Sequence, residues 1–119
     1  MSLTDAEKTR LLAEGCMGWA HSPETEITWS YWDGPRGFMH RTLHWQPLTN
    51  ESHAAEVRER MRELGWWWEI LTYDTYDRIR IEHREVTGPV SVRVDPGAIP
   101  RGICHAALLA IGLAKKGEL

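Results

Sequence analysis

Apolar positions in the first part of the chain recur with the period of a helix. Between residues 5 and 16, Leu12 and Cys16 fall on one helical face. Thr4 and Glu7 are three residues apart at the start of this segment, which is the spacing of a capping box. The pattern therefore predicts a first helix over residues 5–16, with Thr4 as its N-cap.

Two further segments carry the helical period, one in the middle of the chain and one near its end. We expect the middle helix to begin at Thr49 or Asn50, and the last one near Pro100, because proline fits a first helical turn. Lys115 and Lys116 are expected in the final turn of the last helix. The apolar stripe of the middle helix consists of Ala54, Val57, Met61 and Leu64. That of the last helix consists of Ile103, Ala106, Ala107, Ala110 and Ile111.

Three consecutive tryptophans follow Gly65, which is expected to end the middle helix. Large aromatic rings favour an extended chain, in which neighbouring side chains point to opposite faces. The residues expected on one face are Trp66, Trp68 and Ile70, and those on the other are Trp67, Glu69, Leu71 and Tyr73. Each buried indole removes roughly 150–250 Å² from water. We predict that a strand so apolar on both sides is covered on both sides, by helices or by a partner chain.

Shorter alternating stretches complete the expected sheet. Residues 78–83 and 90–94 alternate between apolar and polar side chains, and turn residues separate them. Residues 27–32 and 38–44 can form a hairpin around a turn rich in glycine and proline. Because the connections are short, we predict an antiparallel meander. The expected fold class is α+β, a mainly antiparallel sheet of three to five strands sandwiched between helices in one domain over residues 1–119.

Composition and charge narrow the classes of function. The net charge is −3 with the histidines neutral, so there is no overall basic field for general nucleic-acid binding. No long apolar run or leader peptide is present, so we expect a cytoplasmic protein that makes no membrane contact. Cys16 and Cys104 lie in apolar helical patterns. Core thiols are the simpler interpretation, and a disulfide between helices is the alternative.

Motifs for metal binding or catalysis are not recognisable in the sequence. His40 and His44 would lie roughly 13 Å apart in a strand, which is too far for one ion. No HExxH, CxxC, GxSxG or phosphate-binding glycine loop occurs. We therefore expect no metal and no cofactor. A Ser/His/Asp triad built from distant residues stays open, and an enzyme is the less favoured class.

Three short segments resemble the phage ABA sandwich domain family, which comes from phage and prophage genomes. They are residues 12–19 (LAEGCMGW), 45–50 (WQPLTN) and 100–108 (PRGICHAAL). Their order and separation span almost the whole chain, and the resemblance implies a helix–sheet–helix layering. The chain departs from the family pattern at Leu48 and over residues 21–44. Because the family is defined by fold and phage origin, the resemblance implies no catalytic residues.

A row of arginines beside aromatic side chains is the candidate binding site. Guanidinium groups can hold phosphate through paired hydrogen bonds, and aromatic planes can stack on a base. The candidate ligand-binding residues are Arg78, Arg80, Arg84, Tyr76, Trp32, Arg36, His40 and Arg41. The alternative interpretation is a solvated sheet face, because Glu82 lies in the same row and weakens an anion site.

The leading functional hypothesis is a non-enzymatic phage accessory protein that acts by binding in the host cytoplasm. It would sequester a small anionic, nucleotide-like host signal, an anti-defence function, in a pocket that a homo-oligomer could share. The first alternative is a protein–protein interaction module that docks a host or phage protein through exposed tryptophans. The second is a small nucleotide hydrolase whose general base is His40, His44 or His83 beside a carboxylate.

Overall fold

The helices of the protein follow the apolar stripes of its sequence. The computed structural model describes residues 2–21, 29–32, 38–41, 45–86 and 88–119, and for residues 21, 29–32 and 38–41 it describes the backbone alone. The helical elements are α1 (Asp5–Leu11), a π-helical turn (Leu12–Cys16), α2 (Glu51–Glu63), α3 (Ile99–Ala110) and a 3-10 turn (Lys116–Glu118). None of the helices in these ranges is long and apolar enough to cross a membrane.

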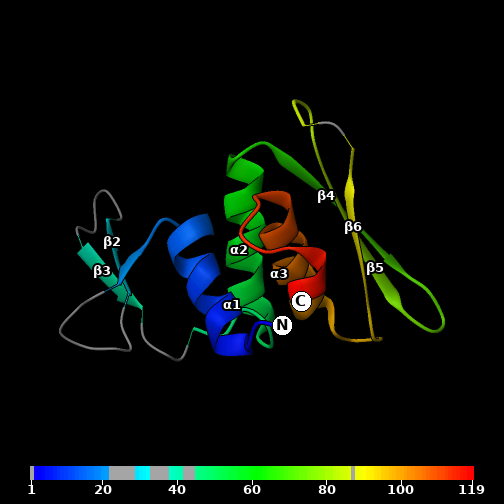
Figure 1. Cartoon of the computed structure of the whole chain (residues 1–119), viewed down its shortest axis with the longest axis horizontal. Coiled ribbons are helices and arrows are strands. Elements are labelled where there is room, and N and C mark those ends of the chain that lie inside the picture. The colour runs from blue at the N-terminus through cyan, green and yellow to red at the C-terminus, as the bar shows by residue number, and fades with distance from the viewer. Residues whose placement is uncertain (1, 22–28, 33–37, 42–44, 87) are drawn as a thin grey trace.

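The described strands form two antiparallel sheets that do not pair with each other. The main sheet has the order β4 (Trp66–Thr72), β5 (Asp77–His83) and β6 (Val90–Val94). The smaller sheet has the order β1 (Ala20–His21), β2 (Trp29–Trp32) and β3 (Phe38–Arg41). The predicted meander and hairpin are both confirmed, and the α+β class with them. The helices lie between β2–β3 and the main sheet (Figure 1).

The residues that the sequence predicts as helix caps and stops take these roles in the structure. The Thr4 hydroxyl accepts from the Glu7 N–H while the Glu7 carboxylate accepts from the Thr4 N–H, so the capping box is complete. Asn50, rather than Thr49, caps α2 through its side-chain oxygen. Gly65 follows α2 with φ at +98°, a conformation that favours glycine.

One end of the last helix differs from the prediction. Helix α3 ends at Ala110, and Gly112 follows with φ at +72°. Lys115 and Lys116 therefore lie beyond the helix, and the 3-10 turn begins at Lys116. A left-handed glycine reverses the chain direction at a helix end, so this lysine pair belongs to a separate C-terminal segment.

The core lies between the helices and one face of the main sheet. Ile79 and Ile81 of β5 are fully buried there, and Trp66 of β4 is nearly so. Burial of one such aliphatic side chain contributes roughly 1.5–3 kcal/mol. Leu64, predicted on the buried stripe of α2, is instead 41% exposed. It lies just after α2, where Gly65 turns the chain away.

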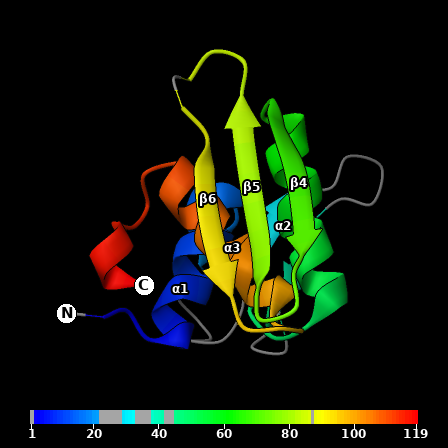
Figure 2. The same cartoon turned by 90° about the vertical axis from the view of Figure 1, so that its right-hand side faces the viewer.

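The opposite face of the main sheet is open. Figure 2 shows β4, β5 and β6 from this side, with the helices behind them. Trp67, which points to this face, is 61% exposed, whereas its neighbour Trp66 is buried. The sequence predicts that helices or a partner chain cover both faces of the strand β4. The described helices cover one of these faces. The open face is consequently where a ligand or partner can reach the strands.

Candidate functional site

Two arginines stand directly opposite each other on the open face. Arg78 of β5 is the register partner of Arg93 of β6. Like charges in this position destabilise a sheet. The Arg78 Nε donates to the Ser91 hydroxyl at 2.7 Å, but in the described ranges neither guanidinium lies within 4.0 Å of a carboxylate. The pair therefore leaves positive charge that an anionic ligand can neutralise.

A pocket adjoins this pair along the free edge of β6. Its volume is about 470 Å³, which lies in the range of small-molecule sites. Its polar and basic lining comes from two strands, α3 and the C-terminal segment. The residues concerned are Arg78, Ser91, Arg93, His105 and Lys116, and Leu119 also lines the pocket. Arg78, Arg93 and Lys116 carry positive charge, so the pocket is suited to an anion.

Aromatic planes lie next to the basic pair. The rings of Tyr73 and Tyr76 are stacked, with centroids 4.7 Å apart. The Arg93 guanidinium lies over the Tyr76 ring at 4.6 Å from its centroid. Such a contact attracts a cation to the ring face and fixes the direction of the guanidinium. Phosphate-binding and base-stacking groups thus occur at one end of the open face.

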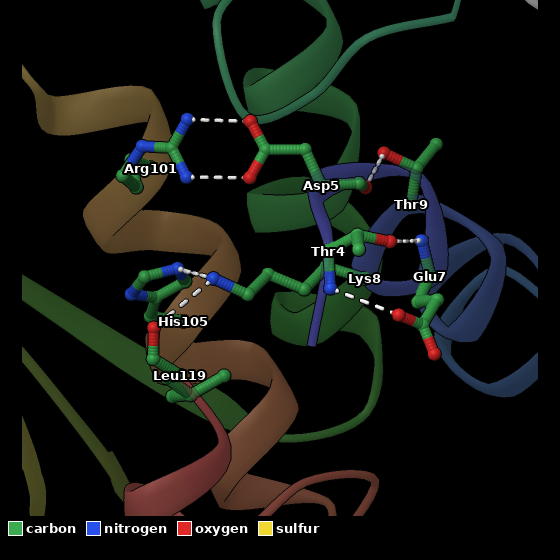
Figure 3. Close-up of polar contacts among 8 residues, drawn as sticks. All are labelled: Thr4, Asp5, Glu7, Lys8, Thr9, Arg101, His105 and Leu119. Carbon is green, nitrogen blue, oxygen red and sulfur yellow. Dashed lines mark hydrogen bonds and ion pairs between the residues drawn. The ribbon is translucent and has the colours of Figure 1, made fainter. Parts of the chain in front are cut away.

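A buried lysine lies behind the pocket wall. Lys8 of α1 is 3% exposed. Its ammonium donates to the Leu119 carbonyl oxygen at 3.2 Å and lies 3.1 Å from the His105 Nε2 (Figure 3). Burial, followed by the charges of Lys8 and Arg101, lowers the pKa of His105 to about 4. The imidazole is therefore neutral near pH 7.

An ion pair holds α1 against α3 beside this lysine. The Arg101 guanidinium donates two hydrogen bonds to the Asp5 carboxylate, at 2.8 and 2.9 Å. These bonds lower the pKa of Asp5 and raise that of Arg101. Asp5 also interacts electrostatically with Lys8, but no described Asp or Glu side chain lies within 4.0 Å of the Lys8 ammonium.

The structure gathers some of the candidate residues that the sequence suggests and separates others. Arg78 and Tyr76 lie at the pocket end of the open face. Arg80 shares that face but pairs with Glu82 at 3.4 Å. Arg84 follows the other end of β5, with its guanidinium 5.7 Å from the Trp67 ring centroid. The remaining candidates lie outside the described side chains, and these are Trp32, Arg36, His40 and Arg41.

Four basic residues of the pocket region escape the sequence analysis. Arg93 could have been found, because residues 90–94 alternate and place it opposite Arg78 in a short hairpin. Lys116 is predicted in the last helix, but that helix ends at Ala110. Lys8 and His105 give no local signal, because their contact joins residues 97 positions apart.

The described residues offer little for metal or nucleophilic chemistry. None of them forms a group of three or more metal-ligating side chains. Cys16 and Cys104 are buried free thiols, which confirms the core interpretation. Burial raises the pKa of Cys16 to about 11 and that of Cys104 as well. His83 donates from Nε2 to the Leu64 carbonyl and accepts at Nδ1 from the Glu85 N–H, so both of its ring nitrogens are engaged.

A second surface surrounds Trp67 at the free edge of β4. Two hollows flank the indole, one of about 390 Å³ on the side of Arg84 and one of about 350 Å³ on the side of Arg58. Leu64, which is 41% exposed, lines the hollow on the side of Arg84. An exposed aromatic ring among such residues is typical of a protein-binding surface.

Comparison with known proteins identifies a family. The family model of the phage ABA sandwich domain matches residues 10–108. The match takes in Arg78, Arg93 and His105 of the pocket, whereas Lys8 and Lys116 lie beyond its ends. Neither the curated proteins nor the solved structures gave a match.

Proposed function

We propose that this chain, which belongs to the phage ABA sandwich domain family, acts by binding a small anionic, nucleotide-like molecule. As a phage protein in the host cytoplasm, it would withhold a host signal from its receptor and thereby serve an anti-defence function. The observation that carries the proposal is the opposed pair Arg78 and Arg93 at a pocket of about 470 Å³.

The chemistry of the pocket favours phosphate over other anions. Arginine presents a rigid fork of donors that matches two phosphate oxygens at once. Arg78 and Arg93 approach from adjacent strands, and Lys116 lines the same pocket from the C-terminal segment. The Tyr76 ring is covered by Tyr73 and Arg93, so the partly exposed Tyr73 ring supplies the aromatic plane on which a base can stack. This combination supports a ligand with a phosphate and a planar ring.

The pocket favours retention of the ligand over its chemical conversion. His105 is the pocket-lining residue that could serve as a general base. Its Nε2 contacts the Lys8 ammonium, and its lowered pKa of about 4 makes it a weak base near pH 7. A ligand held in this pocket would therefore be released unchanged, as sequestration requires.

Calorimetric titration with a panel of nucleotides, including cyclic dinucleotides, tests the proposal. Arg93→Gln should weaken binding at least about tenfold, since a charge-assisted hydrogen bond contributes roughly 1.5–3 kcal/mol. Arg10→Gln is the matched control, because Arg10 pairs with Glu14 on the exposed side of the first helix. Absence of heat with every phosphate compound, or conversion of the ligand on incubation, would contradict the proposal.

The surface around Trp67 favours a second function, the docking of a host or phage protein. It offers a 61% exposed indole between two hollows. Wild-type protein immobilised in an infected-cell lysate should retain a partner that the Trp67→Ser variant loses. The change should leave stability nearly unaltered, because the ring is exposed. Equal recovery by both proteins, or recovery of nothing, would remove this function.

A further inference from the structure

We infer that Lys8 and His105 belong to the anion site, with Lys8 holding the imidazole in the tautomer that carries its proton on Nδ1. His105 then presents a neutral N–H donor to a ligand bound between Arg78, Arg93 and Lys116. This inference rests on the proposed anion binding and narrows the ligand to one with at least two negative charges on phosphate oxygens.

The tautomer follows from which groups can donate. A lysine ammonium carries three donors and no acceptor. The atom that faces it at 3.1 Å is the His105 Nε2, which must therefore accept and be unprotonated. In a neutral imidazole the proton then resides on Nδ1. Figure 3 shows this second ring nitrogen directed away from Lys8.

The ligand charge follows from the basic groups of the lining. Arg78, Arg93 and Lys116 line the pocket, and none of them lies within 4.0 Å of a described Asp or Glu carboxylate. Lys8, which is 3% exposed, adds positive charge behind the pocket wall. A buried cation in this position is stabilised when an anion occupies the pocket. The three basic groups of the lining favour a dianion over a monoanion.

Burial and neighbouring cationic groups keep the His105 imidazole neutral, so that its Nδ1–H can act as the donor. The first helix contributes Lys8 and, farther away, Asp5. Arg101 belongs to the same helix as His105, and the strands and the C-terminal segment contribute the arginines and the lysine of the pocket. Apart from Asp5, which is paired with Arg101, these groups are cationic. A proton on both ring nitrogens is therefore disfavoured, and the donor stays available across the physiological pH range.

Nitrogen-15 NMR of the free protein at pH 7 tests the tautomer without any ligand. In wild-type protein the His105 Nδ1 should be protonated and Nε2 should not. In Lys8→Met the Nε2 loses its donor, so the ring should shift toward the other tautomer. A wild-type imidazole protonated on Nε2, or on both nitrogens, would overturn the inference while leaving the proposed function standing.

Binding of inorganic pyrophosphate tests the role of the pair in the site. Lys8→Met and His105→Leu should each weaken pyrophosphate binding by about tenfold, in line with the loss of a charge-assisted contact, and pyrophosphate should bind wild-type protein more tightly than methyl sulfate does. Lys115→Met is the matched control, because Lys115 is exposed and does not line the pocket. It should change binding by less than about twofold.

The outcomes separate the two proposals. If Lys8→Met does not fold, His105→Leu gives the same comparison. If pyrophosphate binds wild-type protein and both variants equally, the inference is wrong and the anion-binding function remains. If neither pyrophosphate nor any nucleotide binds wild-type protein, the proposed function fails and the inference falls with it.

Discussion

His105 is half-buried and lies beside two cationic side chains, Lys8 and Arg101. Burial, Lys8 and Arg101 together lower its pKa to about 4 in the folded protein, whereas a histidine in an unfolded chain titrates near about 6.5. Between these two pH values the unfolded state binds a proton that the folded state does not. The free energy of unfolding must therefore fall as the pH drops through this window.

Urea denaturation between pH 7.5 and pH 4.5 should show this loss. We expect the free energy of unfolding to decrease by about 1–2 kcal/mol, less than the full pKa shift implies, because His105 is only half-buried and solvent screens it. The His105→Gln variant should show a flatter profile over the same range. The Asp5 carboxylate acts in a different window. Its pKa is lowered by Arg101, so its contribution is lost only below its unfolded value of 3.8. Parallel profiles for wild type and variant would contradict this account.

Some pocket residues can be predicted from the sequence around them, and others cannot. Arg78 and Tyr76 were predictable because alternation places them on a polar face. Lys8 looks like any exposed helix position in the sequence, yet it is buried because α3 and the C-terminal segment close over it. Contacts between residues about 100 positions apart leave no local pattern. Such residues can be found only once the fold brings them together.

Among the elements, α3 approaches the main sheet closely at Gly102. A Cβ at this position would overlap the Ile79 Cδ1 and lie 3.2 Å from the Val94 Cγ1. Both of these side chains belong to strands that α3 covers, and Ile79 is fully buried. The absence of a side chain at residue 102 therefore sets the spacing between helix and sheet.

Gly102→Ala should destabilise the protein by about 1–2 kcal/mol. Overpacking of a core typically costs about 1–3 kcal/mol, and the gain in helix propensity offsets up to about 1 kcal/mol. Gly117→Ala is the control, because nothing lies within 4 Å of a Cβ added there. It should change stability by less than about 0.5 kcal/mol. Urea denaturation measures both, and a Gly102→Ala variant as stable as wild type would refute the close approach.

The elements themselves were largely predictable from the sequence, because their signals are local. The capping box at Thr4, the stop at Gly65 and the alternation of β5 each lie within a few residues of the feature that they set. The errors occur at helix ends. Leu64 completes an apolar stripe by spacing but lies just past the end of its helix. The spacing of apolar residues alone does not show which residue makes the last backbone hydrogen bond of a helix.

At the scale of the whole molecule, the main sheet divides the protein into a packed side and an open side. The packed face carries Trp66 and the β5 isoleucines, and the open face carries Trp67, Arg78 and Arg93. The sequence indicates that Trp66 and Trp67 point to opposite faces, but it does not tell which face the helices cover. That choice depends on how α2 and α3 cross the sheet, which long-range packing decides. Because the helices cover the face with Trp66, the opposite face with Arg78 and Arg93 is exposed.

The pair Trp19 and Trp45 has a consequence for engineering. Their buried rings meet edge to face, with centroids 4.6 Å apart, although 25 residues, from 20 to 44, separate them in the chain. The two ends of that stretch are therefore fastened together by the core, and joining them requires only a short linker. We expect the protein to serve as a scaffold in which this stretch is exchanged for a grafted peptide while the opposite side of the molecule keeps its shape.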